Sequence, residues 1–266
     1  MNKDDFQELI WQKGRELYRD MPWRDNTDPY YVLVSELMLQ QTQVERVIPK
    51  FTAFIKRFPA IRDLASAPLS DVLILWNGLG YNRRAKFLHD AAKKAESDFN
   101  GEIPNDLAGL MSLPGVGPNT AGAIQAYSFN QPVTFIETNI RTVLFHHFFE
   151  DQISVDDSTL LQKLDEVLDR EHPREFYWAL MDYGSYLKKH GAGRINKSAH
   201  YKKQSALHGS VREVRGQIIK LLTKQELSNI QLRSLLQADE RFDQALNGLI
   251  KDRLVSCSDS KYHLTK

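Results

Sequence analysis

The sequence predicts an all-α protein that ends in a small winged-helix-like module. Apolar residues recur at helical spacing up to about residue 205, and few runs alternate as strands do. Glycine and proline interrupt the helical pattern at residues 77–80 and 113–118. After a basic stretch at residues 188–203, a second helical pattern ends in two short strand-like runs. These observations favour helical packing throughout, with one small sheet at the end.

Composition narrows the class of protein. The chain has 266 residues, of which 42% are hydrophobic and 26% are charged, as in ordinary soluble globular proteins. Its formal net charge is only +1, so any nucleic-acid binding must rest on local clusters of charge. The single cysteine, Cys257, excludes a disulfide framework and cysteine-ligated zinc or iron–sulfur sites. No run is apolar enough to span a membrane and no signal-peptide pattern is present, so we expect a soluble intracellular protein.

The shift in composition predicts two domains, residues 1–204 and residues 205–266. The second is expected to hold three helices followed by a hairpin of residues 254–258 and 261–265, which is the outline of a winged helix. Such modules often bind DNA, but they also serve as protein-contact scaffolds. Acidic residues interrupt its basic ones, so the sequence leaves both roles open.

A carboxylate stands in an unusual position in the segment SELMLQQTQV. Asp28 and Pro29 predict a helix start through an N-cap and a first-turn proline. Glu36 then falls within an apolar run of this helix, and the polar residues 40–43 follow at once. A glutamate at such a place either faces water or is kept out of it, and burial would raise the pKa of its carboxyl.

The segment LPGVGPNTAG, residues 113–122, predicts a tight turn between two helices. Gly115 and Gly117 are expected to take backbone conformations that other residues avoid, and Pro118 to open the next helix. The amides of the turn and of the helix N-terminus would then point at one spot and bind an anion such as a DNA phosphate. Its outward carbonyl groups are also placed to hold a monovalent cation. An ordinary corner between helices would use glycine as well.

Five motifs occur in an order that resembles a known family. They are PWR at 22–24, MLQQTQV at 38–44, LWNGLGY at 75–81, LPGVGPNTAGAI at 113–124 and MDYG at 181–184. Together they closely resemble the A/G-specific adenine DNA glycosylases of the helix–hairpin–helix superfamily, over roughly residues 5 to 190. The resemblance implies a two-lobed helix–hairpin–helix fold. It also implies removal of adenine mispaired with 8-oxoguanine or guanine in double-stranded DNA.

Breaking an N-glycosidic bond calls for an acid above the base and a carboxylate near the sugar. The resemblance makes Glu36 the acid that protonates adenine at N7. It places Glu137 where the family has an aspartate, and Asn139 in the supporting network. The extra methylene of Glu137 would move the carboxylate by roughly 1.5 Å, and displacements of that size can cost about a hundredfold in rate.

The remaining site residues also follow from the resemblance. Bifunctional relatives carry a lysine at the position of Asn119, so water is the expected nucleophile and the enzyme is expected to be monofunctional. Trp23 and Arg24 match residues that line the adenine pocket. A flipped base leaves a gap in the DNA stack. The residues expected to fill or border that gap are Leu39, Gln40, Gln41 and Tyr81, although Tyr81 beside Gly80 would also suit core packing.

Contacts with the DNA backbone are expected at the hairpin and in the basic stretch, from Gly115, Val116, Gly117, Thr120, Lys188, Lys189, Arg194 and Lys197. A solvated linker is the alternative for the basic stretch. Most relatives hold a four-cysteine iron–sulfur cluster directly after MDYG. That region has no cysteine here, so no cluster and no other metal site is expected. Too few residues follow for the domain with which many relatives read 8-oxoguanine.

Three functions remain open from the sequence. The leading one is a monofunctional adenine glycosylase that acts on mispaired or oxidised duplex DNA, as a monomer in the bacterial cytoplasm. The second is a mismatch glycosylase for thymine or uracil, because that sister group shares the hairpin and a glutamate. The third is a catalytically weakened binder of damaged DNA, in view of Glu137, Asn119 and the missing cluster.

Overall fold

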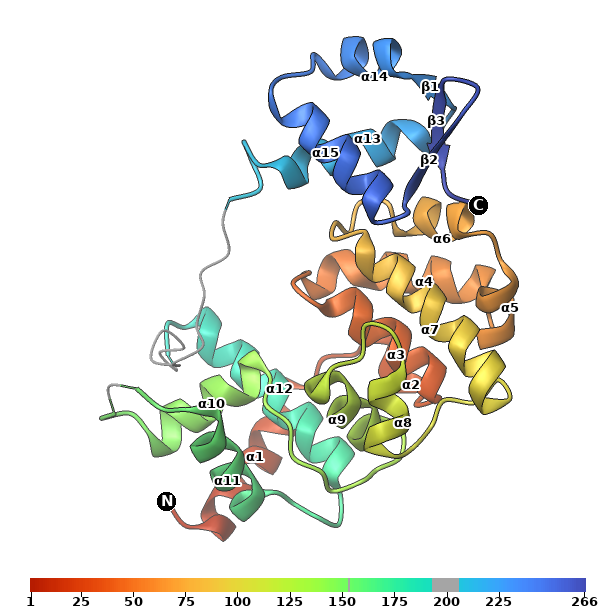
Figure 1. Cartoon of the computed structure of the whole chain (residues 1–266). Coiled ribbons are helices and arrows are strands. Elements are labelled where there is room, and N and C mark those ends of the chain that lie inside the picture. Colours follow the sequence, from red (N-terminus) through yellow and green to blue (C-terminus); the bar gives the residue numbers. More distant parts are fainter. Residues whose placement is uncertain (153, 193–205) are drawn as a thin grey trace. The chain divides into compact units, whose positions relative to one another are not determined.

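A computed structural model describes residues 1–152, 154–192 and 206–266 of the chain (Figure 1). Most of these residues lie in helices, and one small sheet lies near the C-terminus, which confirms the predicted all-α class. No helix in the described ranges combines the length and apolar character needed to cross a membrane. The chain divides into two compact units, and each is described in turn.

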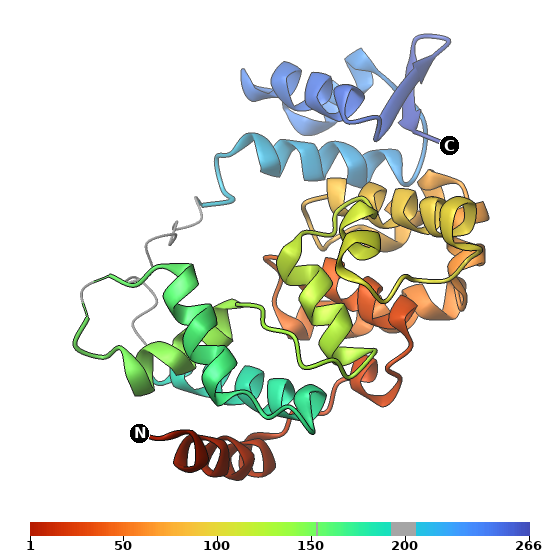
Figure 2. The same cartoon turned by 60° about the horizontal axis from the view of Figure 1, so that its bottom comes forward.

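The first unit comprises Met1–Val32, Asn105–Ser112 and Val116–Lys203. Its helix α12 packs against α1, α9 and α10 (Figures 1 and 2). Gly14 permits one of these contacts, because a Cβ there would lie 2.6 Å from the Cβ of Ala179. The unit contains α1 (Lys3–Leu17), α2 (Pro22–Asp25), α8 (Leu107–Ser112), α9 (Pro118–Tyr127), α10 (Thr138–Phe148), α11 (Asp157–Val167) and α12 (Pro173–Lys189).

Aromatic residues form much of the core of this unit. Phe6 of α1 meets Phe176 of α12 edge to face, with the ring centroids 6.5 Å apart. Phe135 and Tyr177 lie closer, at 4.4 Å, and the hydroxyl of Tyr177 donates to the carbonyl oxygen of Val133 at 2.8 Å. These contacts anchor α12 against the segment that leads into α10, and that segment carries Glu137.

The second unit comprises Leu33–Pro104, Leu113–Gly115 and Gln204–Lys266. Helix α3 (Pro29–Leu39) begins in the first unit and ends in this one. The predicted break before α7 is present, because Gly78 and Gly80 have φ angles of 98° and 74°. The other helices of this part are α4 (Val44–Arg57), α5 (Ile61–Ser66), α6 (Leu69–Trp76) and α7 (Arg83–Phe99).

The C-terminal part of the second unit has the helices and the hairpin that the sequence predicts. The hairpin strands β2 (Val255–Ser258) and β3 (Lys261–Leu264) join through Asp259 and Ser260, whose positive φ angles suit a two-residue turn. The two-residue strand β1 (Leu227–Ser228) was not predicted, and it pairs antiparallel with β3. The helices are α13 (Val211–Leu222), α14 (Asn229–Leu236) and α15 (Arg241–Lys251). The predicted boundary near residue 205 lies at the edge of residues outside the described ranges.

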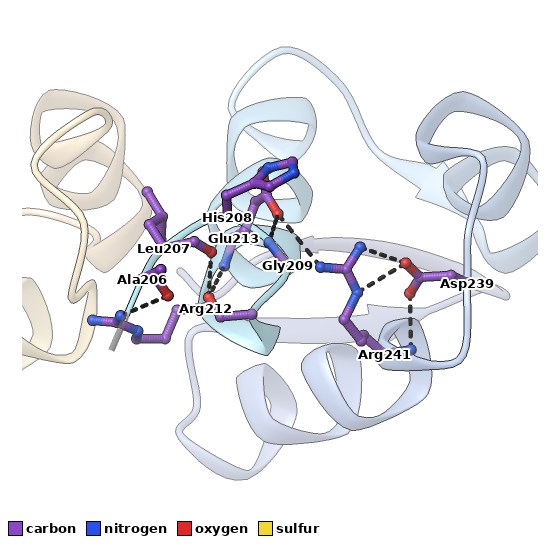
Figure 3. A network of polar contacts seen from close by, with 9 residues as sticks. Ala206, Leu207, His208, Gly209, Arg212, Glu213, Asp239 and Arg241 are labelled. Carbon is purple, nitrogen blue, oxygen red and sulfur yellow. Dashed lines mark hydrogen bonds and ion pairs between the residues drawn. The ribbon is translucent and has the colours of Figure 1, made fainter. Parts of the chain in front are cut away.

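A polar network fixes the start of α13 (Figure 3). Ser210 is the N-cap residue, and Glu213 accepts a hydrogen bond from the amide of Gly209 at 2.9 Å. Arg241 of α15 donates to Glu213 at 3.4 Å and to Asp239 at 2.8 Å. The network therefore joins the starts of two helices. Its members lie near the surface, so each ion pair contributes modestly to stability.

Candidate active site

The expected acid, Glu36, lies in the last turns of α3. The helix begins as predicted, because the amide of Tyr30 donates to Oδ1 of Asp28 at 2.8 Å. Leu33 and Leu37 on either side of Glu36 are fully buried, while Glu36 itself is half-buried. The carboxylate thus stands at the edge of an apolar core, between the protein interior and solvent. This setting agrees with the apolar run seen in the sequence.

The segment after Glu36 is held by one arginine that the sequence reading missed. Helix α3 ends at Leu39, and Gln41 takes a left-handed backbone conformation with φ 55°. Arg84 of α7 is buried, and it donates to carbonyl oxygens that a helix C-terminus leaves without partners. Its acceptors are the carbonyl oxygens of Leu37 (2.7 Å), Met38 (2.9 Å), Gln40 (2.6 Å), Gly80 (3.1 Å) and Leu79 (3.5 Å), and Oγ1 of Thr42 (3.1 Å).

Arg84 thus cross-links the end of α3 to the glycine-containing loop before α7. Burial lowers the pKa of its guanidinium to about 10, so the group stays charged near neutrality. A cation facing the C-terminal carbonyl groups of a helix also opposes the negative end of the helix dipole. Leu39 and Gln40 are half-buried and Gln41 is exposed, so the polar segment lies at the surface of the second unit.

Tyr81 follows this loop and is held by two arginines of the same unit. Its backbone is left-handed, with φ 46°, which is uncommon for a residue with a large side chain. The guanidinium of Arg84 lies 5.5 Å from the centre of its ring, and that of Arg212 in α13 lies 5.2 Å away and donates to its hydroxyl. Tyr81 is half-buried, so it is a surface residue that the two arginines hold in place, and not a core residue.

The predicted turn between two helices is present, but only one of its glycines needs its conformational freedom. Gly115 has φ 83°, and a Cβ there would lie 2.8 Å from the Cβ of Phe87. Gly117 has an ordinary extended backbone with φ −96°, and its neighbourhood has room for a Cβ. The expectation of special backbone geometry at Gly117 is therefore wrong. Pro118 opens α9 as predicted, Val116 is nearly buried and Thr120 lies in the first turn.

Glu137 occupies the N-cap position of α10 without acting as its cap. Its backbone is extended, and its side chain makes no capping hydrogen bond. Asn119 of α9 accepts a hydrogen bond from the amide of Ile136 at 3.4 Å, so it lies beside the segment that carries Glu137. Burial raises the pKa of the Glu137 carboxyl, and the positive charge of Lys188 partly offsets this rise. The fold therefore keeps a carboxylate that it does not use as a helix cap.

Asn139 lies in the first turn of α10, close to α12. Its Nδ2 donates to the sulfur of Met181 at 3.9 Å, and its Oδ1 accepts a hydrogen bond from Nζ of Lys188 at 3.1 Å. Gly184 of the MDYG motif permits this approach, because a Cβ there would overlap the backbone of Asn139. The first unit thus gathers Asn119, Glu137, Asn139 and Lys188 at one place.

The two residues expected at an adenine pocket are almost fully buried. Trp23 is 7% exposed and Arg24 is 6% exposed. Arg24 donates to both carboxylate oxygens of Asp182 in α12, at 2.7 Å and 2.9 Å, and Arg19 donates to the same carboxylate at 2.6 Å. Arg24 is thus part of a buried ion-pair cluster with the aspartate of the MDYG motif, a contact that the sequence reading did not identify.

Of the other predicted phosphate contacts, one is an exposed residue and two lie outside the residues that the structure describes. Lys189, at the end of α12, is exposed. Arg194 and Lys197 lie outside the described residues. A four-cysteine cluster does not fit this chain, because its single cysteine, Cys257, lies exposed in β2. In the part of the chain that the structure describes, no three His, Cys, Asp or Glu side chains gather as metal ligands.

Comparisons with known proteins agree with these motifs. Residues 34–169 match the model of the HhH-GPD superfamily of base excision DNA repair proteins. The chain is 32% identical to an adenine DNA glycosylase of Mycobacterium tuberculosis, over 93% of this chain and 88% of that protein. It is 38% identical to an adenine DNA glycosylase of Buchnera aphidicola, over 64% of this chain but only 48% of that protein.

Solved structures support the fold. A thermostable thymine-DNA glycosylase aligns with a TM-score of 0.65 at 23% identity, over 73% of this chain and 94% of that chain. A non-covalent endonuclease III–DNA complex aligns with a TM-score of 0.60 at 18% identity, over 73% and 91%. The family match and the Mycobacterium relative together decide the assignment. The chain belongs to the HhH-GPD superfamily of base excision DNA repair proteins, and within it to the adenine DNA glycosylase family.

Proposed function

We propose that this protein is a monofunctional DNA glycosylase that hydrolyses the N-glycosidic bond of adenine mispaired with 8-oxoguanine or guanine in duplex DNA. The observation that carries the proposal is the 32% identity to an adenine DNA glycosylase across 93% of the chain. The half-buried carboxylate of Glu36 at the end of α3 supports it. The protein would act as a monomer on DNA in a bacterial cytoplasm.

In this mechanism Glu36 supplies the proton. A glutamate at the edge of an apolar core that is still open to solvent is suited to give a proton to N7 of the flipped adenine. Protonation turns adenine into a better leaving group, and the electrons of the breaking C1′–N9 bond leave with the base. The sugar then acquires oxocarbenium character.

Glu137 would stabilise that positive charge, and water would complete the reaction. An ionised carboxylate near C1′ is most effective where water does not screen it, and Glu137 is a poorly solvated carboxyl. Asn119 lies beside this segment and has no amine to form an imine with the sugar. Water therefore attacks C1′ and releases one proton to solvent, and the strand is left uncut at the abasic site. No cofactor takes part in these steps.

Duplexes that hold A opposite 8-oxoguanine, A opposite G, T opposite G and U opposite G test the substrate. Each is incubated with the protein under single-turnover conditions, and half of each sample is then heated in alkali. The proposal expects cleavage of the adenine strand only, and only after alkali. Cleavage of the pyrimidine strand would favour the thymine or uracil enzyme, and strand cutting without alkali would contradict monofunctional chemistry. Tight binding without base release would favour a weakened binder.

A Glu36→Gln variant tests the assignment of the acid. The amide is nearly isosteric but has no carboxyl proton to donate, so adenine release should fall by at least about a hundredfold. Glu8→Gln is a matched control, because Glu8 is an exposed glutamate on α1. Binding to an uncleavable substrate duplex should stay within about twofold in both variants. Retained turnover by Glu36→Gln would remove Glu36 from this role.

A further inference from the structure

We infer that Lys188 is a positioning residue of the active site, which orients the amide of Asn139 and supplies a positive charge that acts on the Glu137 carboxylate. The inference rests on the proposed role of Glu137. It differs from the phosphate contact that the sequence predicts for Lys188, because the amine of Lys188 is engaged within the first unit. Three features of that unit carry it.

The first feature is the close approach of two helices. Gly184 lies where α12 meets the backbone of Asn139 so tightly that a side chain at this position would overlap it. Lys188 follows Gly184 by four residues and therefore lies on the same face of α12, one turn further along. The contact between α10 and α12 thus delivers the lysine to the start of α10.

The second feature is the hydrogen bond itself. Nζ of Lys188 donates to Oδ1 of Asn139 at 3.1 Å, although the residue lies at the protein surface. A surface lysine usually stays mobile, because holding it costs side-chain entropy. The bond also sets the orientation of the amide, because Oδ1 faces the amine and Nδ2 faces Met181. The Asn139 amide is therefore fixed from both of its ends.

The third feature is electrostatic. Lys188 is the charged group that acts on the Glu137 carboxyl among the described residues, and it lowers the pKa that burial raises. Burial and, to a lesser extent, repulsion by Arg19 lower the pKa of the Lys188 amine, while the charge of Glu137 raises it. From α9 the neighbouring side chain is the uncharged Asn119, and in α10 Arg141 is paired with Asp157. Lys188 is thus the counter-charge that favours ionised Glu137.

The pH dependence of the single-turnover rate tests this role. In Lys188→Met, Glu137 takes up a proton at higher pH than in the wild type, so the acid limb of the profile moves to higher pH. We expect a rate loss of about tenfold at the acidic end and a much smaller loss at the alkaline end. Lys188→Arg should restore most of the wild-type profile, because it keeps the charge. Lys3→Met removes an exposed lysine on α1 that has no proposed role at the site, and it should leave the profile unchanged.

A folding measurement tests the same coupling without catalysis. Urea unfolding should show that the stability of Lys188→Met relative to the wild type falls as the pH rises from about 4.5 to 7, because only the wild type offsets the cost of ionising Glu137. The sign follows because a carboxyl with a raised pKa contributes stability at low pH that is lost as it ionises. In a Glu137→Gln background the Lys188→Met substitution should lose this pH dependence.

The two measurements separate the inference from the proposed function. The wild type could release no base while the pH dependence of Lys188→Met unfolding still disappears in the Glu137→Gln background. In that case the proposed function fails and the charge interaction between Lys188 and Glu137 stands. If Lys188→Met behaves like Lys3→Met in both measurements, the positioning role is overturned. Trapping of a Lys188–DNA adduct by borohydride would also overturn it, because Lys188 would then be a nucleophile.

Discussion

Two acidic residues of the first unit show how differently one fold treats buried carboxylates. Asp182 in α12 is almost completely buried and accepts hydrogen bonds from Arg24 and Arg19 at 2.6–2.9 Å. Glu137 at the start of α10 is partly buried, has no capping role, and faces only the more distant charge of Lys188 among the described residues. Among the described residues, the carboxylate that joins the helices is paired with two arginines, whereas the carboxylate proposed to act on the sugar has no close cation.

The largest effect should come from removing the charge of Asp182. Asp182→Asn leaves Arg24 buried with an uncompensated charge, so the free energy of unfolding should fall by about 3–5 kcal/mol. Urea unfolding measures it. Asp165→Asn is the matched control, because Asp165 pairs with Arg170 at an exposed site, and it should cost less than about 1 kcal/mol. Equal losses in the two variants would show that Asp182 is not a structural ion pair.

Glu137→Gln should lose activity and keep its stability, whereas Asp182→Asn should lose stability. Base release should fall by at least about a hundredfold, because the developing positive charge on the sugar loses its counter-ion. Stability should not fall. Because burial raises the pKa of Glu137, its ionised form costs folding free energy near pH 7, and the glutamine variant avoids that cost.

The stability gain of Glu137→Gln should therefore be greatest at neutral pH and vanish as the pH falls below the ordinary glutamate value of 4.5. Urea unfolding at pH 7.5 and at pH 4.0 measures the two ends of this range. A variant that is less stable at both pH values would indicate that the carboxylate supports the fold, and the contrast with Asp182 would then disappear.

The smallest effect should come from the outer arginine of the Asp182 cluster. The side chain of Arg19 is 30% exposed, and Arg24 still neutralises Asp182 after its loss. Arg19→Gln should therefore lower the free energy of unfolding by about 1 kcal/mol. It also removes a positive charge near Lys188, so the pKa of that amine should rise. A loss as large as that of Asp182→Asn would mean that both arginines are needed.

Local signals in the sequence predicted much of the fold. The N-cap and proline at residues 28–29, the glycines of residues 77–80 and the hairpin turn at residues 259–260 each specify a backbone geometry over a few residues, and the structure has each of them. Gly117 was misread because a glycine before a helix has two uses, and here it serves as an ordinary extended N-cap.

The contacts of the site were less predictable than its motifs. Arg84, Asp182 and Lys188 stand within or next to recognised motifs, but a motif does not show where a long side chain turns. Arg84 reaches residues more than 40 positions away, and Lys188 reaches Asn139 only because of the space at Gly184. Such contacts depend on how helices pack, which short-range patterns do not specify.

The Arg84 cross-link has a consequence for engineering. Two segments that are expected to read DNA, the end of α3 and the loop before Tyr81, are both bound by the side chain of Arg84. Neither can be grafted from a relative by itself, because the incoming segment must present its carbonyl groups to the same guanidinium. Chimeras that exchange both segments together with α7 should fold, whereas those that exchange one should lose the register between them. In recombination experiments, these two stretches of sequence should therefore be exchanged together.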